Sequence, residues 1–103
     1  MREKRQHARK PVDLPAILVV EGDPTPWGAH ARDMSIGGVF VETDVRPAFG
    51  TRVTLTIAFE GMADALELPA IVRWSSPEGL GLQFGLLGAR ETHAIAAAIS
   101  AAR

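Results

Sequence analysis

The sequence contains no cysteine, which excludes disulfide bonds, thiolate metal sites and cysteine nucleophiles. It also contains no apolar run near the roughly 18 residues that a membrane-spanning helix requires. No apolar stretch follows the basic start of the chain, so we expect neither a secretory signal nor membrane insertion. A cytoplasmic location is the expectation that follows from these absences.

Patterns typical of catalytic and metal sites are also missing. The three histidines, His7, His30 and His93, lie far apart and without the spacing of metal ligands. Gly79-Leu80-Gly81 lacks the third glycine and the following helix of a dinucleotide-binding loop, and no P-loop is present. Ser35 has no base that the pattern would place beside it. We therefore expect no enzyme, no metal site and no cofactor.

The formal net charge of −1 conceals a basic N-terminus. Residues 1–10 contain five basic side chains and one acidic side chain, so this segment carries +4 and the remainder of the chain −5. A basic arm on an otherwise acidic domain could bind a small anion, or a phosphate backbone, at one place. The competing interpretation is a solvated basic terminus without a ligand.

After the arm, apolar and polar residues alternate in short segments separated by turn residues, which is typical of β-strands. Pro24-Thr25-Pro26 predicts a loop, and Gly37-Gly38 predicts a turn in which glycines take positive φ. Six such segments predict a mainly β fold, a closed antiparallel barrel without exposed edges. The expected strands cover residues 12–20, 28–33, 39–43, 53–60, 66–74 and 80–84.

The C-terminal segment has a different composition. From Ala89 to Arg103 it is rich in alanine and lacks proline and glycine, which favours a helix. Ile95 and Ile99 share one narrow apolar stripe, so we expect this helix to dock on the barrel. The chain is therefore expected to be a single domain with a flexible basic arm (1–11), a six-stranded antiparallel β-barrel (12–86) and a C-terminal α-helix (88–103).

Two short motifs carry polar groups suited to a nucleotide ligand. Arg5 and Arg9 are four residues apart, and each guanidinium presents a planar fork of donors that fits phosphate oxygens. The second motif contains Asp33, Ser35 and Gly38. Its carboxylate can accept hydrogen bonds from a guanine, and its glycine lets a flat base approach the backbone. Each motif alone is also explained by an ordinary basic terminus or an ordinary turn.

Together, the two motifs resemble the hallmark of the PilZ family, an R-x-x-x-R arm followed by a D/N-x-S-x-x-G hairpin. Residues 71–74 and 79–84 resemble the last strand pair of that family, so the resemblance covers nearly the whole chain. It implies a bacterial receptor for cyclic di-GMP, whose two phosphodiesters and two guanines would be bound by Arg5, Arg9, Asp33, Ser35 and Gly38. The signal would pass to an unidentified protein partner by a change of shape, in motility or exopolysaccharide regulation.

The resemblance also implies three secondary positions. Lys4 matches a position that influences how many ligand molecules bind, and Gly37 is a further candidate contact. Trp74 matches a position that can lie near the ligand, but its phase with Val72 favours a core aromatic residue that closes the barrel. We further expect Arg5 and Arg9 to be mobile in the free domain and to become ordered when the ligand binds.

Two other functions would also use a basic arm or a small barrel. A nucleic-acid-binding barrel would use the basic arm on a phosphate backbone and aromatic residues on its strands. The barrel itself is acidic, so we expect no nucleic-acid polymer as a partner. A PilZ-like adaptor that acts through protein contacts alone, without ligand, stays the alternative, although both motifs are intact.

Overall fold

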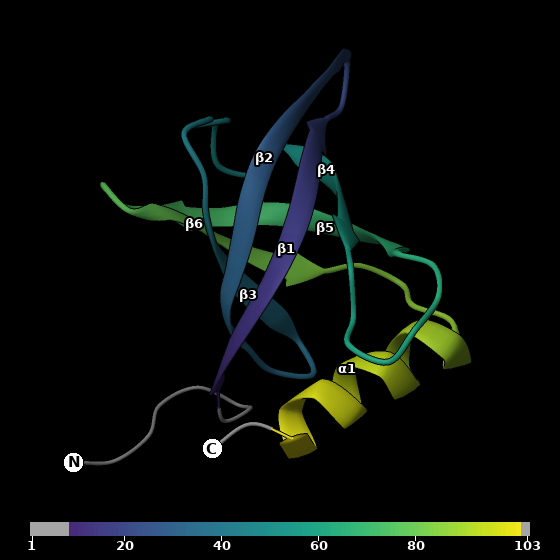
Figure 1. The fold of residues 1–103 in the computed structure, drawn as a ribbon. Helices are drawn as coiled ribbons and strands as arrows, with labels where there is room; N and C mark the ends of the chain where they lie inside the picture. Colours follow the sequence, from purple (N-terminus) through teal and green to yellow (C-terminus); the bar gives the residue numbers. More distant parts are fainter. Residues whose placement is uncertain (1–8, 102–103) are drawn as a thin grey trace, which may run out of the picture.

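The computed structural model describes residues 9–101 (Figure 1). Two long strands open the chain, and four shorter strands and one helix follow. In chain order these elements are β1 (Lys10–Val20), β2 (Asp23–Met34), β3 (Gly38–Glu42), β4 (Arg52–Ile57), β5 (Leu66–Ser75), β6 (Gly79–Phe84) and α1 (Ala89–Ala101). Among these residues, no helix is both long and apolar enough to cross a bilayer.

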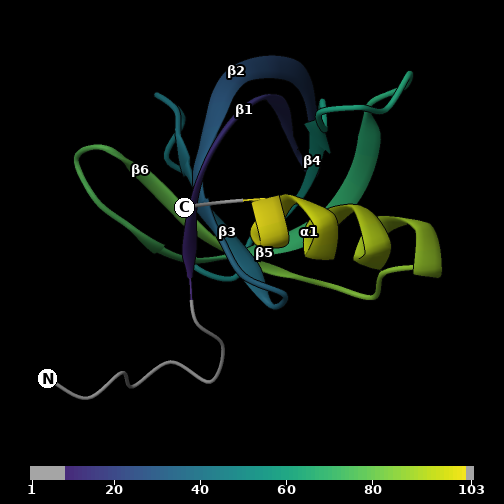
Figure 2. The same cartoon turned by 60° about the horizontal axis from the view of Figure 1, so that its bottom comes forward.

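The six strands form a closed barrel in the order β1-β2-β3-β6-β5-β4, in which every neighbouring pair is antiparallel. The pairing of β1 with β4 closes the barrel and leaves no open sheet edge. The six-stranded barrel and its C-terminal helix are thus confirmed. Figures 1 and 2 show α1 across one end of the barrel, opposite the tip of the β1–β2 hairpin.

Period-two alternation places the core inside the barrel, as the sequence predicted. In β5, for example, Leu66, Leu68, Ala70 and Val72 are buried and the residues between them point outward. The helix adds Ile95, which is 1% exposed, so α1 docks through the expected stripe. Burying a side chain of this size contributes roughly 1.5–3 kcal/mol, which offsets the marginal stability of a short alanine-rich helix.

The loop predicted at Pro24-Thr25-Pro26 is wrong, because β2 already begins at Asp23. The turn before it is shorter and contains Gly22, which has a φ of 86°. Prolines are tolerated at this end of β2 because β3 pairs with β2 only from His30 onward. On that side, the backbone of residues 24–26 has no neighbouring strand that requires an N–H donor.

Candidate functional site

The turn between β2 and β3 is closed by Ser35. Its backbone N–H donates to the Gly38 carbonyl at 2.8 Å, and its Oγ accepts from the backbone N–H groups of Gly37 and Gly38 at 3.2 Å each. The residue is only 5% exposed. In the free chain Ser35 therefore holds the shape of the turn, and a direct contact of its hydroxyl with a ligand stays a prediction.

Gly38 is required by the close approach of β6 rather than by its own backbone angle. A Cβ at this position would lie 2.4 Å from the Leu82 carbonyl oxygen, far inside any real contact. The expected positive φ at Gly37 and Gly38 is wrong, since within residues 9–101 positive φ occurs only at Gly22, Gly50 and Gly61. The turn follows an ordinary backbone path, and the missing side chain makes room for a neighbouring strand.

A β-bulge in β2 turns Asp33 toward the outer face of the barrel. The pairing with β3 slips by one residue between Ala31 and Asp33, so Arg32 and Asp33 both lie outside the core. There Arg9 Nη1 donates to Asp33 Oδ1 at 2.8 Å. The structure thus brings together one residue from each predicted motif, although 24 residues separate them in the sequence.

The first arginine of the R-x-x-x-R motif, Arg5, lies outside the described residues, and so does Lys4. Their predicted roles stay predictions. Arg9 is described: its side chain is 18% exposed and that of Asp33 is 37% exposed. This ion pair is therefore partly shielded from water, and the carboxylate is its more exposed partner.

The prediction that Trp74 closes the barrel core is wrong. A second bulge shifts the pairing of β5 with β6 between Val72 and Trp74, which moves the indole to the outer face, where it is 47% exposed. There Trp74 stacks on Phe40, with ring centroids 5.3 Å apart and ring planes 16° apart. The indole also covers Gly81, at which a Cβ would lie 2.1 Å from Trp74 Nε1.

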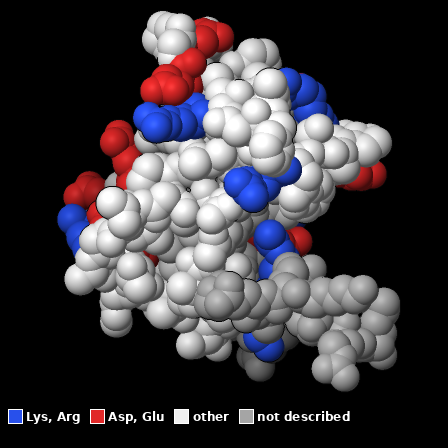
Figure 3. Space-filling model, turned by 180° about the vertical axis from the view of Figure 1, so that it is seen from behind, with Lys and Arg blue, Asp and Glu red and all other residues white. Residues whose placement is uncertain are grey.

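The ion pair and the aromatic stack lie in one row across the barrel. Asp33 pairs with Phe40, Phe40 with Gly81, and Gly81 with Trp74, so four neighbouring strands contribute to the row. Paired residues point to the same side of a sheet, which places the carboxylate beside the rings. Seen from behind, the molecule carries basic side chains along its middle and acidic ones mainly toward its margins (Figure 3).

This row offers three kinds of contact to a ligand. Arg9 presents guanidinium donors for an anion, Asp33 presents carboxylate acceptors, and the two rings present an apolar flat surface. Sequence reasoning missed Phe40, although a signal for it exists: the residue is out of phase with Val39 and Val41, which are fully buried. Such a set of contacts fits a nucleotide with a phosphate and a purine.

Comparison with known proteins identifies the family. The family model described as "PilZ domain" matches residues 3–101. The chain belongs to the PilZ family. Cellulose synthase 2 of Novacetimonas hansenii is 30% identical to it over 90 residues. The match covers 82% of this chain and 6% of that synthase, so the chain spans only a small part of this relative's length.

Three solved structures, two of them of PilZ domains, have the same fold. The PilZ domain of CeSA from a cellulose-synthesizing bacterium has a TM-score of 0.71 and 16% identity, over 90% of this chain and 95% of that one. The PilZ domain of YcgR from Escherichia coli, solved with c-di-GMP, has a TM-score of 0.76 and 15% identity, over 97% of this chain and 92% of that one. The Bacillus subtilis inhibitor of motility MotI/DgrA has a TM-score of 0.74 and 20% identity, over 96% of this chain and 50% of that one.

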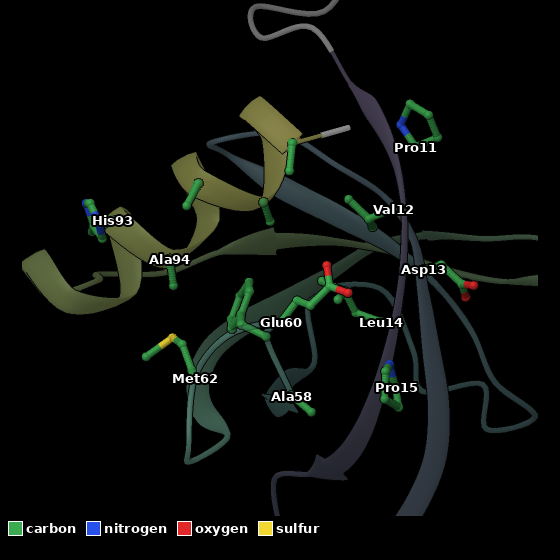
Figure 4. Close-up of a pocket in the computed structure, with 14 residues that line it drawn as sticks. Pro11, Val12, Asp13, Leu14, Pro15, Ala58, Glu60, Met62, His93 and Ala94 are labelled. Atoms are coloured by element: carbon green, nitrogen blue, oxygen red, sulfur yellow. The ribbon is translucent and has the colours of Figure 1, made fainter. Parts of the chain in front are cut away.

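A groove of about 630 Å³ separates α1 from β1 in this PilZ domain. Val12 and Leu14 point into it, Asp13 points away, and the carboxylate of Glu60 lies between the strand and the helix (Figure 4). None of the site residues predicted within residues 9–101 lines this groove. The same part of the chain contains no group of three or more His, Cys, Asp or Glu side chains that could hold a metal ion.

Proposed function

We propose that this PilZ domain is a receptor for cyclic di-GMP. The observation that carries the proposal is the contact between Arg9 and Asp33, because it joins the two motifs in one place on the outer face. The family of the chain supports the proposal, and so does its likeness in fold to a PilZ domain solved with c-di-GMP. In this proposal Arg5 joins from the arm as the second phosphate-binding arginine.

Ligand binding would exchange the partners of the ion pair. In the free domain Arg9 and Asp33 neutralise each other, and a partly exposed pair of this kind contributes only about 0–1 kcal/mol. With ligand, Arg9 would donate to a phosphate and Asp33 would accept from the N1 and exocyclic amine of a guanine. Each such charge-assisted hydrogen bond contributes about 1.5–3 kcal/mol, so the exchange favours the bound state.

The remaining residues of the site would shape and extend it. Ser35 and Gly38 hold the turn that follows Asp33, so the carboxylate leaves the barrel at a fixed angle. Gly37 would let a base approach the turn. Trp74 and the ring stacked on it would offer a surface for a guanine. Lys4 would influence whether one ligand molecule or a stacked pair binds.

The output would be a ligand-dependent change of surface that a protein partner reads. A cellulose synthase and an inhibitor of motility are among the similar proteins, which supports a role in exopolysaccharide or motility control in the bacterial cytoplasm. No catalytic step is part of the proposal, since the PilZ family consists of ligand-binding and adaptor domains.

Isothermal titration of the full chain with cyclic di-GMP tests the proposal. We expect a dissociation constant in the micromolar range or tighter. Cyclic di-AMP has the same phosphates but lacks the guanine donors that Asp33 would bind, and a single-stranded RNA without guanine shares only the ribose-phosphate backbone. Both should give no saturable heat. Absence of binding to cyclic di-GMP contradicts the proposal and favours the ligand-independent adaptor.

A further inference from the structure

Arg32 lies at the bulge of β2 and contacts acidic residues on both neighbouring strands. Its Nη1 donates to Asp13 Oδ1 in β1 at 3.2 Å, and its Nε forms an ion pair with Glu42 Oε1 in β3 at 3.0 Å. A guanidinium can serve two acceptors in this way because its donors point in separate directions from one plane. One side chain thereby bridges three strands beside the ion pair of Arg9 and Asp33.

Asp13 lies beside the Asp33 segment in the pairing of β1 with β2, because Pro11 is opposite Asp33 and Leu14 is opposite Ala31. It lies four residues after Arg9 in the chain, and a register shift in β1 between Pro11 and Leu14 falls at this residue. Its carboxylate also contacts His30 Nε2. Asp13 thus contacts Arg32 and His30, whereas Arg9 contacts Asp33.

Charge counting shows what Arg32 contributes. Two arginines and three carboxylates lie on this surface, namely Arg9 and Arg32 against Asp13, Asp33 and Glu42, which gives −1 without His30. Without Arg32 the same surface would carry −2 around a single arginine. A surface with this charge would repel a ligand with two phosphates. Asp13, without its arginine, would also compete with Asp33 for Arg9.

We propose that Arg32 is a positioning residue of the ligand site: it neutralises Asp13 and Glu42 and so keeps Arg9 paired with Asp33. Arg32 itself would not contact the ligand. The inference rests on the proposed binding of cyclic di-GMP for its effect on affinity. The pairing of Arg9 is a property of the free domain, and it can be tested without any ligand.

The first experiment measures cyclic di-GMP affinity by titration calorimetry. Arg32→Gln should weaken binding about fivefold to tenfold, which corresponds to the combined size of two partly exposed charge interactions. Adding Asp13→Asn to Arg32→Gln removes the competing carboxylate and should recover most of the loss. Arg32→Lys keeps the charge and should stay within about twofold of the wild type. Arg90→Gln, at the exposed start of α1, is the matched control and should bind like the wild type.

Two results would overturn the proposal. One is wild-type affinity in Arg32→Gln, and the other is a double variant that binds as weakly as Arg32→Gln. Loss in Arg32→Lys equal to that in Arg32→Gln would also contradict it, because the role would then depend on geometry rather than charge. Thermal melts of each variant without ligand separate these results from misfolding.

The second experiment uses NMR of the arginine side chains in the free domain. In the wild type, the Arg9 Nε–H resonance should respond to Asp33→Asn. In the Arg32→Gln background it should respond to Asp13→Asn instead. If the wild type does not bind cyclic di-GMP, the proposed function fails but this readout still decides the role of Arg32. An Arg9 resonance that responds in the same way in both backgrounds overturns the inference.

Discussion

Arg9 and Asp33 contribute little to the stability of the fold, and this makes them available for a ligand. Their contact is an ion pair between partly exposed side chains on the outer face, and such pairs contribute about 0–1 kcal/mol. The core lies on the other side of the strands and does not include either residue. At the residue scale, binding and stability are therefore separable.

Arg9→Ala should weaken the binding of cyclic di-GMP about 30- to 150-fold, because a charge-assisted phosphate contact contributes about 2–3 kcal/mol. The melting temperature without ligand should stay nearly unchanged. Titration calorimetry and a thermal melt followed by circular dichroism measure the two quantities.

Arg90→Ala is the control for this substitution, since it removes an arginine of the same chain from an exposed helix position. It should change neither quantity. A steep fall of the melting temperature in Arg9→Ala would contradict the separation, because it would make Arg9 a structural ion-pair residue.

At the scale of elements, the contact between β3 and β6 depends on glycine. A Cβ at Gly38 would lie 2.4 Å from the Leu82 carbonyl oxygen, and a Cβ at Gly79 would lie 1.9 Å from the Val41 carbonyl oxygen. In both cases the obstacle is backbone, which cannot rotate away as a side chain can. The position of the Asp33 turn is thus coupled to the spacing of these two strands.

Gly38→Ala should therefore lower the free energy of unfolding by about 2–3 kcal/mol, the upper part of the range of about 1–3 kcal/mol for forcing an extra methyl into a packed site. Gly28→Ala is the matched control, because nothing lies within 4 Å of the Cβ it would add and its φ is not positive. Denaturation in urea measures both variants. Equal stabilities would show that the strands can separate at no cost.

The sequence predicted the elements well where local pattern determines them. Alternation along residues 66–72 identified a strand and its buried face, and the apolar stripe of α1 identified its docking side. Trp74 was assigned to the wrong face because a bulge reverses the phase, and a bulge depends on how the partner strand pairs. The contact of Arg9 with Asp33 likewise depends on pairing across strands, so only the motif resemblance could suggest it.

At the scale of the whole molecule, charge is distributed so that attraction for an anion is local. The net charge of the chain is only −1, while residues 1–10 carry +4. The remainder of the chain carries −5, so the surface outside the arm does not attract polyanions at long range. A ligand with two phosphates would be attracted mainly beside the arm and Arg9.

The affinity for cyclic di-GMP should consequently fall as salt is added, by roughly tenfold between 50 and 500 mM sodium chloride, because ions screen the phosphate contacts. Titrations at three salt concentrations measure this slope. If the dependence of affinity on salt disappears in Arg9→Ala, the phosphate contacts of Arg9 are its cause. Affinity that does not change with salt would indicate that guanine contacts with Asp33 carry the binding.

The bulge that moves Trp74 out of the barrel also gives the domain an optical reporter. The chain has two tryptophans, and the second, Trp27, lies in β2 near the tip of the hairpin, away from the Asp33 turn. Trp74 stands in the same row as Asp33 and is in contact with Phe40. Its emission therefore reports on the outer face directly, and occupancy of that face can be followed in solution without an attached dye.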